Sequence, residues 1–308
     1  MSTEASKAAV RRFYEEVWDK GNTGELDALA APELVIHERA GAVPYRERWK
    51  REIAAIRAGF GGIRVTLEDL IGEGDKAVSR WRFEGTHTGE FRGIAPTGKR
   101  TVLTGITVFR IQHGRVTECW NSADALGWMQ LGAIPNSIGR PGHRPELTRA
   151  AGAGGPANGG HAVPTEENKA VIRRLFAEVF TAGDVAAVPE LVAPDVLGHD
   201  ATSAEPKRGL ESVRQVAVLF RTAFPDLRLR LEDLIAEGDK VVARWTLRGT
   251  HRGAFMGVPA TGKTAEAAGI VVYRLAGGKI TEYWGSFDAL GLFRQLGAIP
   301  EPADRAGS

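Results

Sequence analysis

The chain has 308 residues, a net charge of +2, 43% hydrophobic and 25% charged residues, the composition of a globular protein with room for about two domains. It has no basic stretch interleaved with aromatic residues, no apolar run of the roughly 18 residues that a membrane span needs, and no signal-peptide core, so we expect a cytoplasmic protein without nucleic-acid or membrane partners. The single cysteine, Cys119, excludes an internal disulfide and a multi-cysteine metal site, and we expect no structural metal.

The first predicted element is an amphipathic helix, and it occurs twice in the chain. Apolar residues at i, i+3, i+4, i+7 and i+8 form one face of a helix. They are Val10, Phe13, Tyr14, Val17 and Trp18 near the start, and Ile172, Leu175, Phe176, Val179 and Phe180 later. A short helix near 24–31, ended by Pro32, and a short strand at 34–38 are expected next.

A third helix is predicted at about 48–60, with a counterpart at 211–224. Four strands follow, near 63–71, 76–86, 100–111 and 115–121. Glycine-containing turns such as Glu73-Gly74-Asp75 connect them, which is typical of an antiparallel meander.

The later elements also repeat. The stretch LEDLIGEGDKAVSRWRFEGTHTGEF from Leu67 returns as LEDLIAEGDKVVARWTLRGTHRGAF from Leu231. The endings are nearly identical as well, with DALGWMQLGAIP from Asp124 and DALGLFRQLGAIP from Asp288. We interpret these two aspartates as caps of a last short helix, because Asp before an apolar run is a normal N-cap.

The residues between the two copies include AAGAGGPANGGHAVP, a composition that cannot build a core and is typical of a flexible tether. We therefore predict a first domain at 1–135, a linker at 136–166 and a second domain at 167–303.

Helices followed by a meander predict an α+β domain in which helices cover one face of a curved sheet. Such a sheet forms a cone-shaped barrel with an apolar interior, which is a natural pocket for a small molecule. The other face of each sheet must also be buried. We expect the two tandem domains to bury these faces against each other as an intramolecular pseudo-dimer, and a further homodimer stays open.

The helix opening VRRFYEEV, the EGDK turn, the GTHTGEF segment, PTGK and the DALG…QLGAIP ending resemble the SnoaL-like polyketide cyclase (ester cyclase) family, over nearly all of both copies. The resemblance implies a cone-shaped fold of the ketosteroid-isomerase-like group. It also implies ring closure of a polyketide by intramolecular aldol chemistry without a cofactor.

In that family the last strand reads like E-H-W-D, and its Asp is the general acid/base. The matching positions here are Asn121 and Gly285, and the neighbouring His is replaced by Cys119 and Tyr283. An amide cannot exchange a proton near neutral pH, and glycine has no side chain, so the standard mechanism is altered in both copies. Asn121 and Tyr283 stay candidates for catalytic hydrogen bonding.

The first strand of each copy carries a second set of candidates. His37 and Glu38 match His199 and Asp200, and the resemblance implies a carboxylate base near this point. Successive strand residues face opposite sides, so only one of each pair can enter the cone. The alternative is that one residue bonds a neighbouring loop and the other is solvated.

Other positions are candidates for substrate binding. His87 and His251 lie in G-T-H segments, where each would bond a substrate carbonyl or hold a loop. The resemblance places Thr107 and Val271 where some cyclases carry a pocket His, and Trp120 and Trp284 on the opposite face. The remaining candidates for the pocket wall are Tyr14, Trp81, Cys119, Phe176 and Trp245.

Three functions remain open from the sequence. The first is a cofactor-free cyclase or isomerase of a polyketide-like or other apolar oxygenated molecule, folded into reactive shape by the cone. The second is an epoxide-opening cyclase or epoxide hydrolase, which needs Glu38 or Asp200 plus another acid. The third is a non-catalytic binding protein, which the altered acid/base positions favour.

Overall fold

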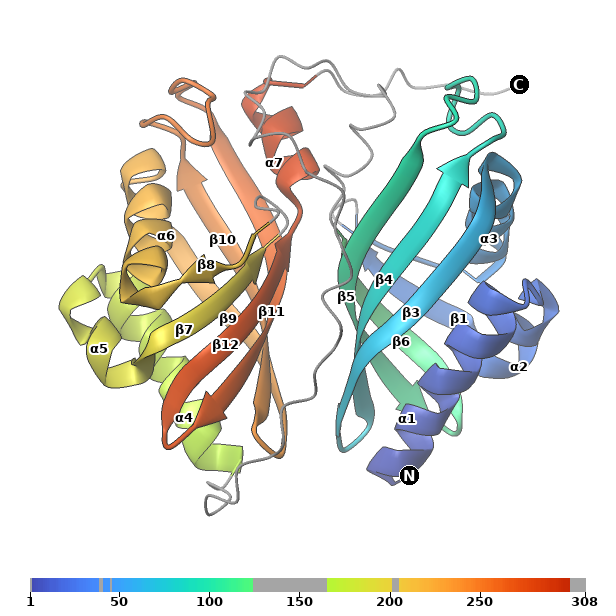
Figure 1. Ribbon diagram of the computed structural model, residues 1–308, viewed down its shortest axis with the longest axis horizontal. Helices are drawn as coiled ribbons and strands as arrows, with labels where there is room; N and C mark the ends of the chain where they lie inside the picture. The colour runs from blue at the N-terminus through green and yellow to red at the C-terminus, as the bar shows by residue number, and fades with distance from the viewer. Residues whose placement is uncertain (1, 39–40, 45, 124–164, 201–204, 300–308) are drawn as a thin grey trace.

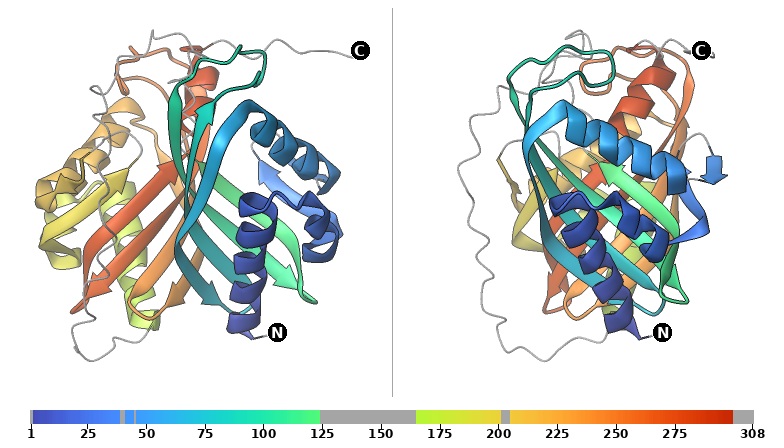
Figure 2. Two further views of the ribbon diagram at one scale, coloured as in Figure 1. Left: turned by 45° about the vertical axis from the view of Figure 1, so that its right-hand side comes forward. Right: turned by 90° about the vertical axis from the view of Figure 1, so that its right-hand side faces the viewer.

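The computed structural model describes residues 2–38, 41–44, 46–123, 165–200 and 205–299, arranged as two sheet-and-helix halves that lie side by side (Figure 1). Asp124 and most of the predicted linker lie outside the described residues. The helices of each half cover the outer side of its sheet, and the two sheets lie between them (Figures 1 and 2). This is the predicted α+β fold in two tandem copies.

The first half begins with helices and continues with a sheet. The helices are α1 (Thr3–Arg12), η1 (Phe13–Asp19), η2 (Thr23–Glu25), α2 (Leu26–Leu29) and α3 (Arg46–Gly59). The strands are β1 (Ala30–Glu38), β2 (Gly41–Pro44), β3 (Phe60–Glu73), β4 (Lys76–His87), β5 (Arg100–Gln112) and β6 (Arg115–Ala123). The sheet order is β2-β1-β6-β5-β4-β3, and only the β1–β6 pairing is parallel.

The second half repeats this arrangement. Its helices are α4 (Thr165–Arg174), η4 (Leu175–Ala182), η5 (Val185–Ala187), α5 (Val188–Leu191), α6 (Gly209–Ala223) and α7 (Ala289–Leu296). Its strands are β7 (Val192–Asp200), β8 (Lys207–Arg208), β9 (Arg228–Glu237), β10 (Lys240–Thr250), β11 (Thr264–Ala276) and β12 (Lys279–Phe287), in the order β8-β7-β12-β11-β10-β9.

Two details near the start of the sheet differ from the prediction. The short helix ends at Leu29, and β1 begins at Ala30, so Pro32 lies within a strand instead of ending a helix. A proline is tolerated there because the β1–β6 register shifts between Ala30 and Val35, which leaves the missing N–H without a ladder bond to make. The short edge strands β2 and β8 were not predicted.

The last helix shows the predicted cap. The carboxylate of Asp288 accepts a hydrogen bond of 2.7 Å from the backbone N–H of Gly291, and α7 ends at Gly297 in the left-handed region, with φ of 77°. Leu292, Phe293 and Leu296 of α7 are buried in the core of the second half. The helix therefore closes one end of the cone.

The faces of the two sheets that lie away from the helices pack against each other. Their shared cluster is formed by Ile71, Val78, Ile106, Val108, Ile235, Val242, Ile270 and Val272, with Trp120 and Trp284 packed at its edge. Val108 and Val272 are fully buried. Both tryptophans thus lie on the face opposite the cone, as predicted.

Polar contacts between the halves come in reciprocal pairs. Lys76 binds Asp233 at 2.6 Å, and Lys240 binds Asp69 at 2.7 Å. The hydroxyl of Ser122 donates to that of its equivalent, Ser286, at 3.0 Å. Such matched contacts are the pattern of an isologous interface, in which each partner offers the same patch to the other.

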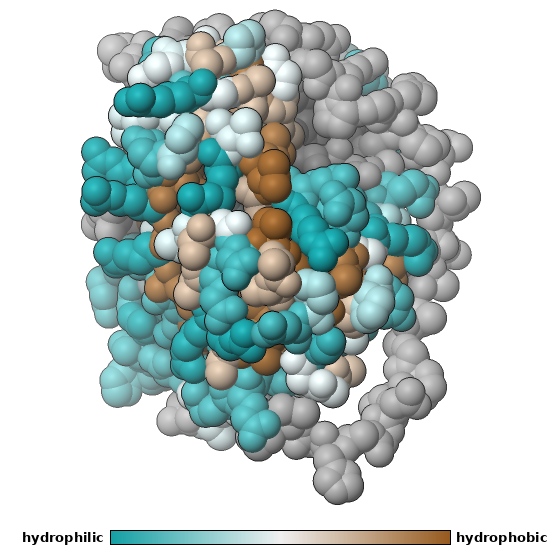
Figure 3. Space-filling view, turned by 90° about the vertical axis from the view of Figure 1, so that its left-hand side faces the viewer, coloured by the Kyte–Doolittle hydropathy of each residue, from teal (hydrophilic) through white to brown (hydrophobic). Residues whose placement is uncertain are grey.

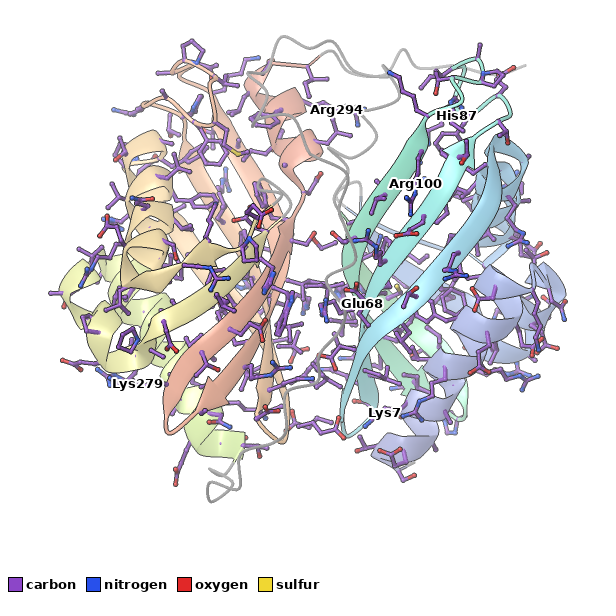
Figure 4. All side chains as sticks on the ribbon, in the orientation of Figure 1. Lys7, Glu68, His87, Arg100, Lys279 and Arg294 are labelled. Carbon is purple, nitrogen blue, oxygen red and sulfur yellow. The ribbon has the colours of Figure 1, made fainter. Side chains whose placement is uncertain are left out.

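The ends of the interface repeat the pattern. Lys7 of α1 binds Glu237 at 2.7 Å, and its equivalent Lys169 binds Glu73 at 2.6 Å (Lys7 is labelled in Figure 4). Among the described residues, no helix combines the length and the apolar character that crossing a membrane requires.

Candidate functional site

The second half contains a cavity of about 190 Å³ between the concave face of its sheet and α6. Apolar side chains form most of its wall, and they include the predicted residues Phe176, Trp245 and Val271. Seen from this side, apolar residues gather in the middle of an otherwise polar face (Figure 3). Leu219 of α6 lines the cavity and is 37% exposed, so the cavity reaches the surface at this helix.

Glycine makes room for the largest side chain of this wall. The ring of Trp245 lies over Gly269 of the neighbouring strand, where any Cβ would overlap it. The first half has the same pair, Trp81 over Gly105. Each tryptophan therefore lies flat on the inner face of its sheet.

Polar groups are concentrated in one part of the cavity. Asp200, at the end of β7, and Lys207, in β8, both line it and form an ion pair of 2.6 Å. Tyr283 and Tyr273 also line it, with ring centroids 6.2 Å apart. A carboxylate, an ammonium group and a phenol thus face the same apolar space.

The hydroxyl of Tyr283 is buried, and no described group completes a hydrogen bond with it. Burial and the negative charge of Asp200 both raise the pKa of Tyr283, so the phenol keeps its proton at neutral pH. An unpaired buried donor costs free energy that a ligand acceptor can recover. Tyr283 is thus suited to donate a hydrogen bond to a bound molecule.

The position of Tyr283 depends on Gly198, its register partner on the parallel strand β7. The phenol ring lies over Gly198, where a Cβ would overlap it. In the first half the same pair is Ile36 and Cys119. Glycine and tyrosine have replaced a large and a small residue together, which keeps the wall filled.

This packing predicts a sharp difference between two glycine substitutions. Gly198→Ala should displace the ring of Tyr283 and destabilise the protein by about 1–3 kcal/mol, because the added methyl group has no space. Gly285→Ala should be tolerated, because its Cβ would meet only a methyl group of Val271, at 3.7 Å. Denaturant unfolding measures both, and equal destabilisation by the two variants would contradict the predicted role of Gly198.

The first half presents hydrogen-bonding groups where the second half is apolar. The indole N–H of Trp81 donates to the hydroxyl of Thr107, and this hydroxyl donates to Oδ1 of Asn121, both at 2.9 Å. The hydroxyl of Tyr14 lies 2.8 Å from that of Ser79. Cys119 is buried nearby. The predicted residues of the first half are therefore brought together on one face.

His37 and His199 lie on the opposite face of their sheets. His37 stacks on Trp120 with ring centroids 4.6 Å apart and contacts Glu118 at 2.8 Å. His199 stacks on Trp284 and contacts Glu282 at 2.9 Å. Neither histidine faces the interior of its cone, so we leave both out of the proposed site.

The strand partners of these histidines differ in what the structure describes. Asp200 enters the cavity, as the alternation of a strand requires when His199 faces away. The side chain of Glu38 lies outside the described residues.

His87 and His251 hold loops. Each is fully buried, and its Nδ1 accepts a hydrogen bond from the backbone N–H of Thr97 or Thr261, at 3.2 and 3.3 Å (His87 is labelled in Figure 4). Because Nδ1 accepts, the proton of each neutral ring lies on Nε2. Neither histidine is among the residues that line the cavity.

Burial lowers the pKa of His251 below its ordinary value of 6.5, because the neutral imidazole is favoured in the folded protein. The unfolded chain then takes up a proton that the folded chain refuses. The stability that this histidine contributes is complete above pH 6.5 and is lost as the pH falls through the folded pKa.

We therefore expect the unfolding free energy to fall below pH 6.5, by at most about 1.4 kcal/mol per pH unit from this group. His251→Gln should remove that part of the slope. His113→Asn, at an exposed turn residue with φ of 51°, should retain it. Denaturant unfolding between pH 5 and pH 8 measures the slopes. Equal slopes for the wild type and His251→Gln would contradict the prediction.

Comparison with known families decides the identity of the fold. The family model described as SnoaL-like polyketide cyclase matches residues 8–131 and again residues 170–296. The chain belongs to the SnoaL-like polyketide cyclase family. It carries two copies of the family domain, one in each half.

Two curated relatives are similar over one domain. Aklanonic acid methyl ester cyclase DauD of Streptomyces sp. (strain C5) is 32% identical over 130 residues, which cover 41% of this chain and 80% of the relative. Aklanonic acid methyl ester cyclase DnrD of Streptomyces peucetius is also 32% identical, over 41% of this chain and 88% of the relative. The solved structure of TsrD from Streptomyces laurentii is 29% identical, covers 44% of this chain and 98% of its own, and has a TM-score of 0.41.

For a SnoaL-like cyclase the cavity of the second half is unusual. Gly285 lines it at the position where the resemblance implied the acid/base Asp, and Asp200 supplies a carboxylate from another strand. Sequence reasoning missed Lys207, because β8 has two residues and no repeating pattern. It also missed Ser79, although the exchange of Ser79 for Ala243 between the copies was a readable signal.

Proposed function

We propose that the second half is a cofactor-free polyketide cyclase whose proton-transfer group is Asp200. The observation that carries the proposal is the convergence of the carboxylate of Asp200 and the phenol of Tyr283 in an otherwise apolar cavity. Membership of the cyclase family and the similarity to two aklanonic acid methyl ester cyclases support the reaction type.

The cavity suits part of a ring compound. Its volume of about 190 Å³ slightly exceeds the roughly 150 Å³ of an engineered apolar cavity that binds benzene. One or two fused rings can be enclosed, and the rest of a larger substrate would extend past Leu219 at the opening. Enclosure would hold the flexible chain in the folded shape that ring closure needs.

The proposed reaction is an intramolecular aldol addition. The carboxylate of Asp200 removes a proton from the carbon next to a carbonyl group, and the resulting enolate carbon attacks a second carbonyl carbon of the same molecule. A carbon–carbon bond forms, and the new alkoxide takes the proton back from Asp200. The net change is an isomerisation with no redox partner.

Two neighbours of Asp200 would support these steps. The phenol of Tyr283 donates a hydrogen bond to the developing enolate, and such donors in water-poor sites stabilise the charge that forms in the transition state. The ammonium group of Lys207 holds the carboxylate in its ionised form before proton removal.

We also propose that the two halves act as one pseudo-dimer in solution. The reciprocal ion pairs and the shared apolar cluster support this arrangement.

The test is ring closure of aklanonic acid methyl ester, the compound in the printed names of the relatives, without any added cofactor. We expect the wild-type protein to convert it or a close analogue. Gly285→Phe places a ring in the cavity and should lower turnover more than about tenfold. The control Arg248→Phe adds a ring at an exposed position of the same half and should retain turnover. Unchanged turnover by Gly285→Phe would contradict an active site in this cavity.

A further inference from the structure

The row of polar side chains in the first half consists of Trp81, Thr107, Asn121, Tyr14 and Ser79. Tyr14 and Thr107 are each 5% exposed and Ser79 is fully buried, so protein groups and not water hold the row together. Burial raises the pKa of Tyr14, which therefore keeps its proton. The row is neutral along its whole length.

The order of donors fixes the orientation of the amide of Asn121. An indole N–H can only donate, so Trp81 occupies a lone pair of Thr107. Thr107 has one proton and gives it to Oδ1 of Asn121. The amide nitrogen Nδ2 must then point away from Thr107, with two N–H donors.

These donors are available to a ligand. Asn121 is exposed, and no described residue accepts a hydrogen bond from its Nδ2. Trp18, Trp49 and Trp81 are partly buried against the core of this half. A flat aromatic ring can stack on such surfaces. The exposed end of the row therefore combines N–H donors with a half whose core is rich in tryptophan.

The second half acts as an internal control for the purpose of the row. Tyr14, Ser79, Thr107 and Asn121 are matched there by Phe176, Ala243, Val271 and Gly285, in that order. The second half forms the same sheet without these polar groups. Burying polar groups costs free energy that an apolar wall does not. The row is thus not needed for the fold, and a ligand explains its presence.

We propose that the first half is a second, separate binding site, in which Nδ2 of Asn121 donates a hydrogen bond to a carbonyl oxygen of an oxygenated aromatic compound. The amide neither takes up nor releases a proton near neutral pH. The site therefore holds its ligand without converting it, and it is independent of the Asp200 site.

Calorimetric titration of the full chain with emodin, a hydroxyanthraquinone, tests the proposal. We expect two molecules per wild-type chain and one per Gly285→Phe chain, in which the added ring occupies the second-half cavity. Val271→Phe provides a second blocked variant, and circular dichroism verifies folding. One molecule per wild-type chain together with none in both blocked variants would overturn the proposal, and so would no binding to the wild type.

Variants in the Gly285→Phe background identify the donor. Asn121→Asp removes both N–H groups and should weaken emodin binding by about tenfold or more, the size of one hydrogen bond. Thr107→Val frees the amide to rotate and should weaken binding by about threefold. Thr117→Val removes a hydroxyl that bonds the backbone of Arg110 and should leave the affinity unchanged. An affinity within twofold of the parent for Asn121→Asp would overturn the assignment.

Discussion

Asp200→Asn should lower kcat by about 100- to 10,000-fold, the usual contribution of a general acid or base. The amide has nearly the shape of the carboxylate but cannot accept the proton of the substrate. Its place in the cavity should be retained, so KM should change little. Steady-state kinetics on aklanonic acid methyl ester, or on the analogue that the wild type converts, measures both constants.

A matched control is available in the same half. Asp226→Asn makes the same chemical change at a carboxylate that bonds Thr250 and is not among the cavity-lining residues. It should leave kcat unchanged. If Asp200→Asn kept a kcat within threefold of the wild type while remaining folded, Asp200 would not be the base, and the proposed mechanism would be wrong.

Val272→Asp should be the most destabilising single change at the interface between the halves. Val272 is fully buried in the cluster that the two sheets share, where a carboxylate finds neither water nor a partner within that cluster. Burying an unpaired charge belongs to the class of substitutions that cost more than about 4 kcal/mol. Denaturant unfolding gives the free energy, and small-angle scattering reports whether the halves separate.

Val218→Asp serves as the comparison for this substitution. Val218 lies on α6 and is 52% exposed, so the same exchange should change the unfolding free energy by no more than about 0.5 kcal/mol. Equal effects of the two substitutions would mean that Val272 is exposed in solution, which would contradict the pseudo-dimer.

Much of the fold could be predicted because the repeat presented every pattern twice. The helical spacing of Val10, Phe13, Tyr14 and Val17 predicted a buried face, and all four residues are buried. Strand alternation also holds. It separates Trp284, which packs against the interface cluster, from Tyr283 and Gly285, which line the cavity. Period-two geometry is a local property, so the sequence is enough to infer it.

The pairing of side chains across strands could not be predicted in the same way. The exchange of Ile36 and Cys119 for Gly198 and Tyr283 is meaningful only once β7 is known to lie parallel beside β12. These strands are far apart in the sequence, and their register is set by tertiary packing. The ion pair of Asp200 with Lys207 has the same origin, because the edge strand β8 is too short to show a pattern.

The matched contacts between the halves, such as Ser122 with Ser286, have an evolutionary consequence. In a dimer of identical subunits, each mutation alters both pockets at once, and a change that benefits one and harms the other is lost. Fusion of two copies into one polypeptide removes this constraint. Tyr283 could arise beside Gly198 in one pocket while Asn121 kept its donors in the other, so a single gene supports two specialised chambers on one shared scaffold.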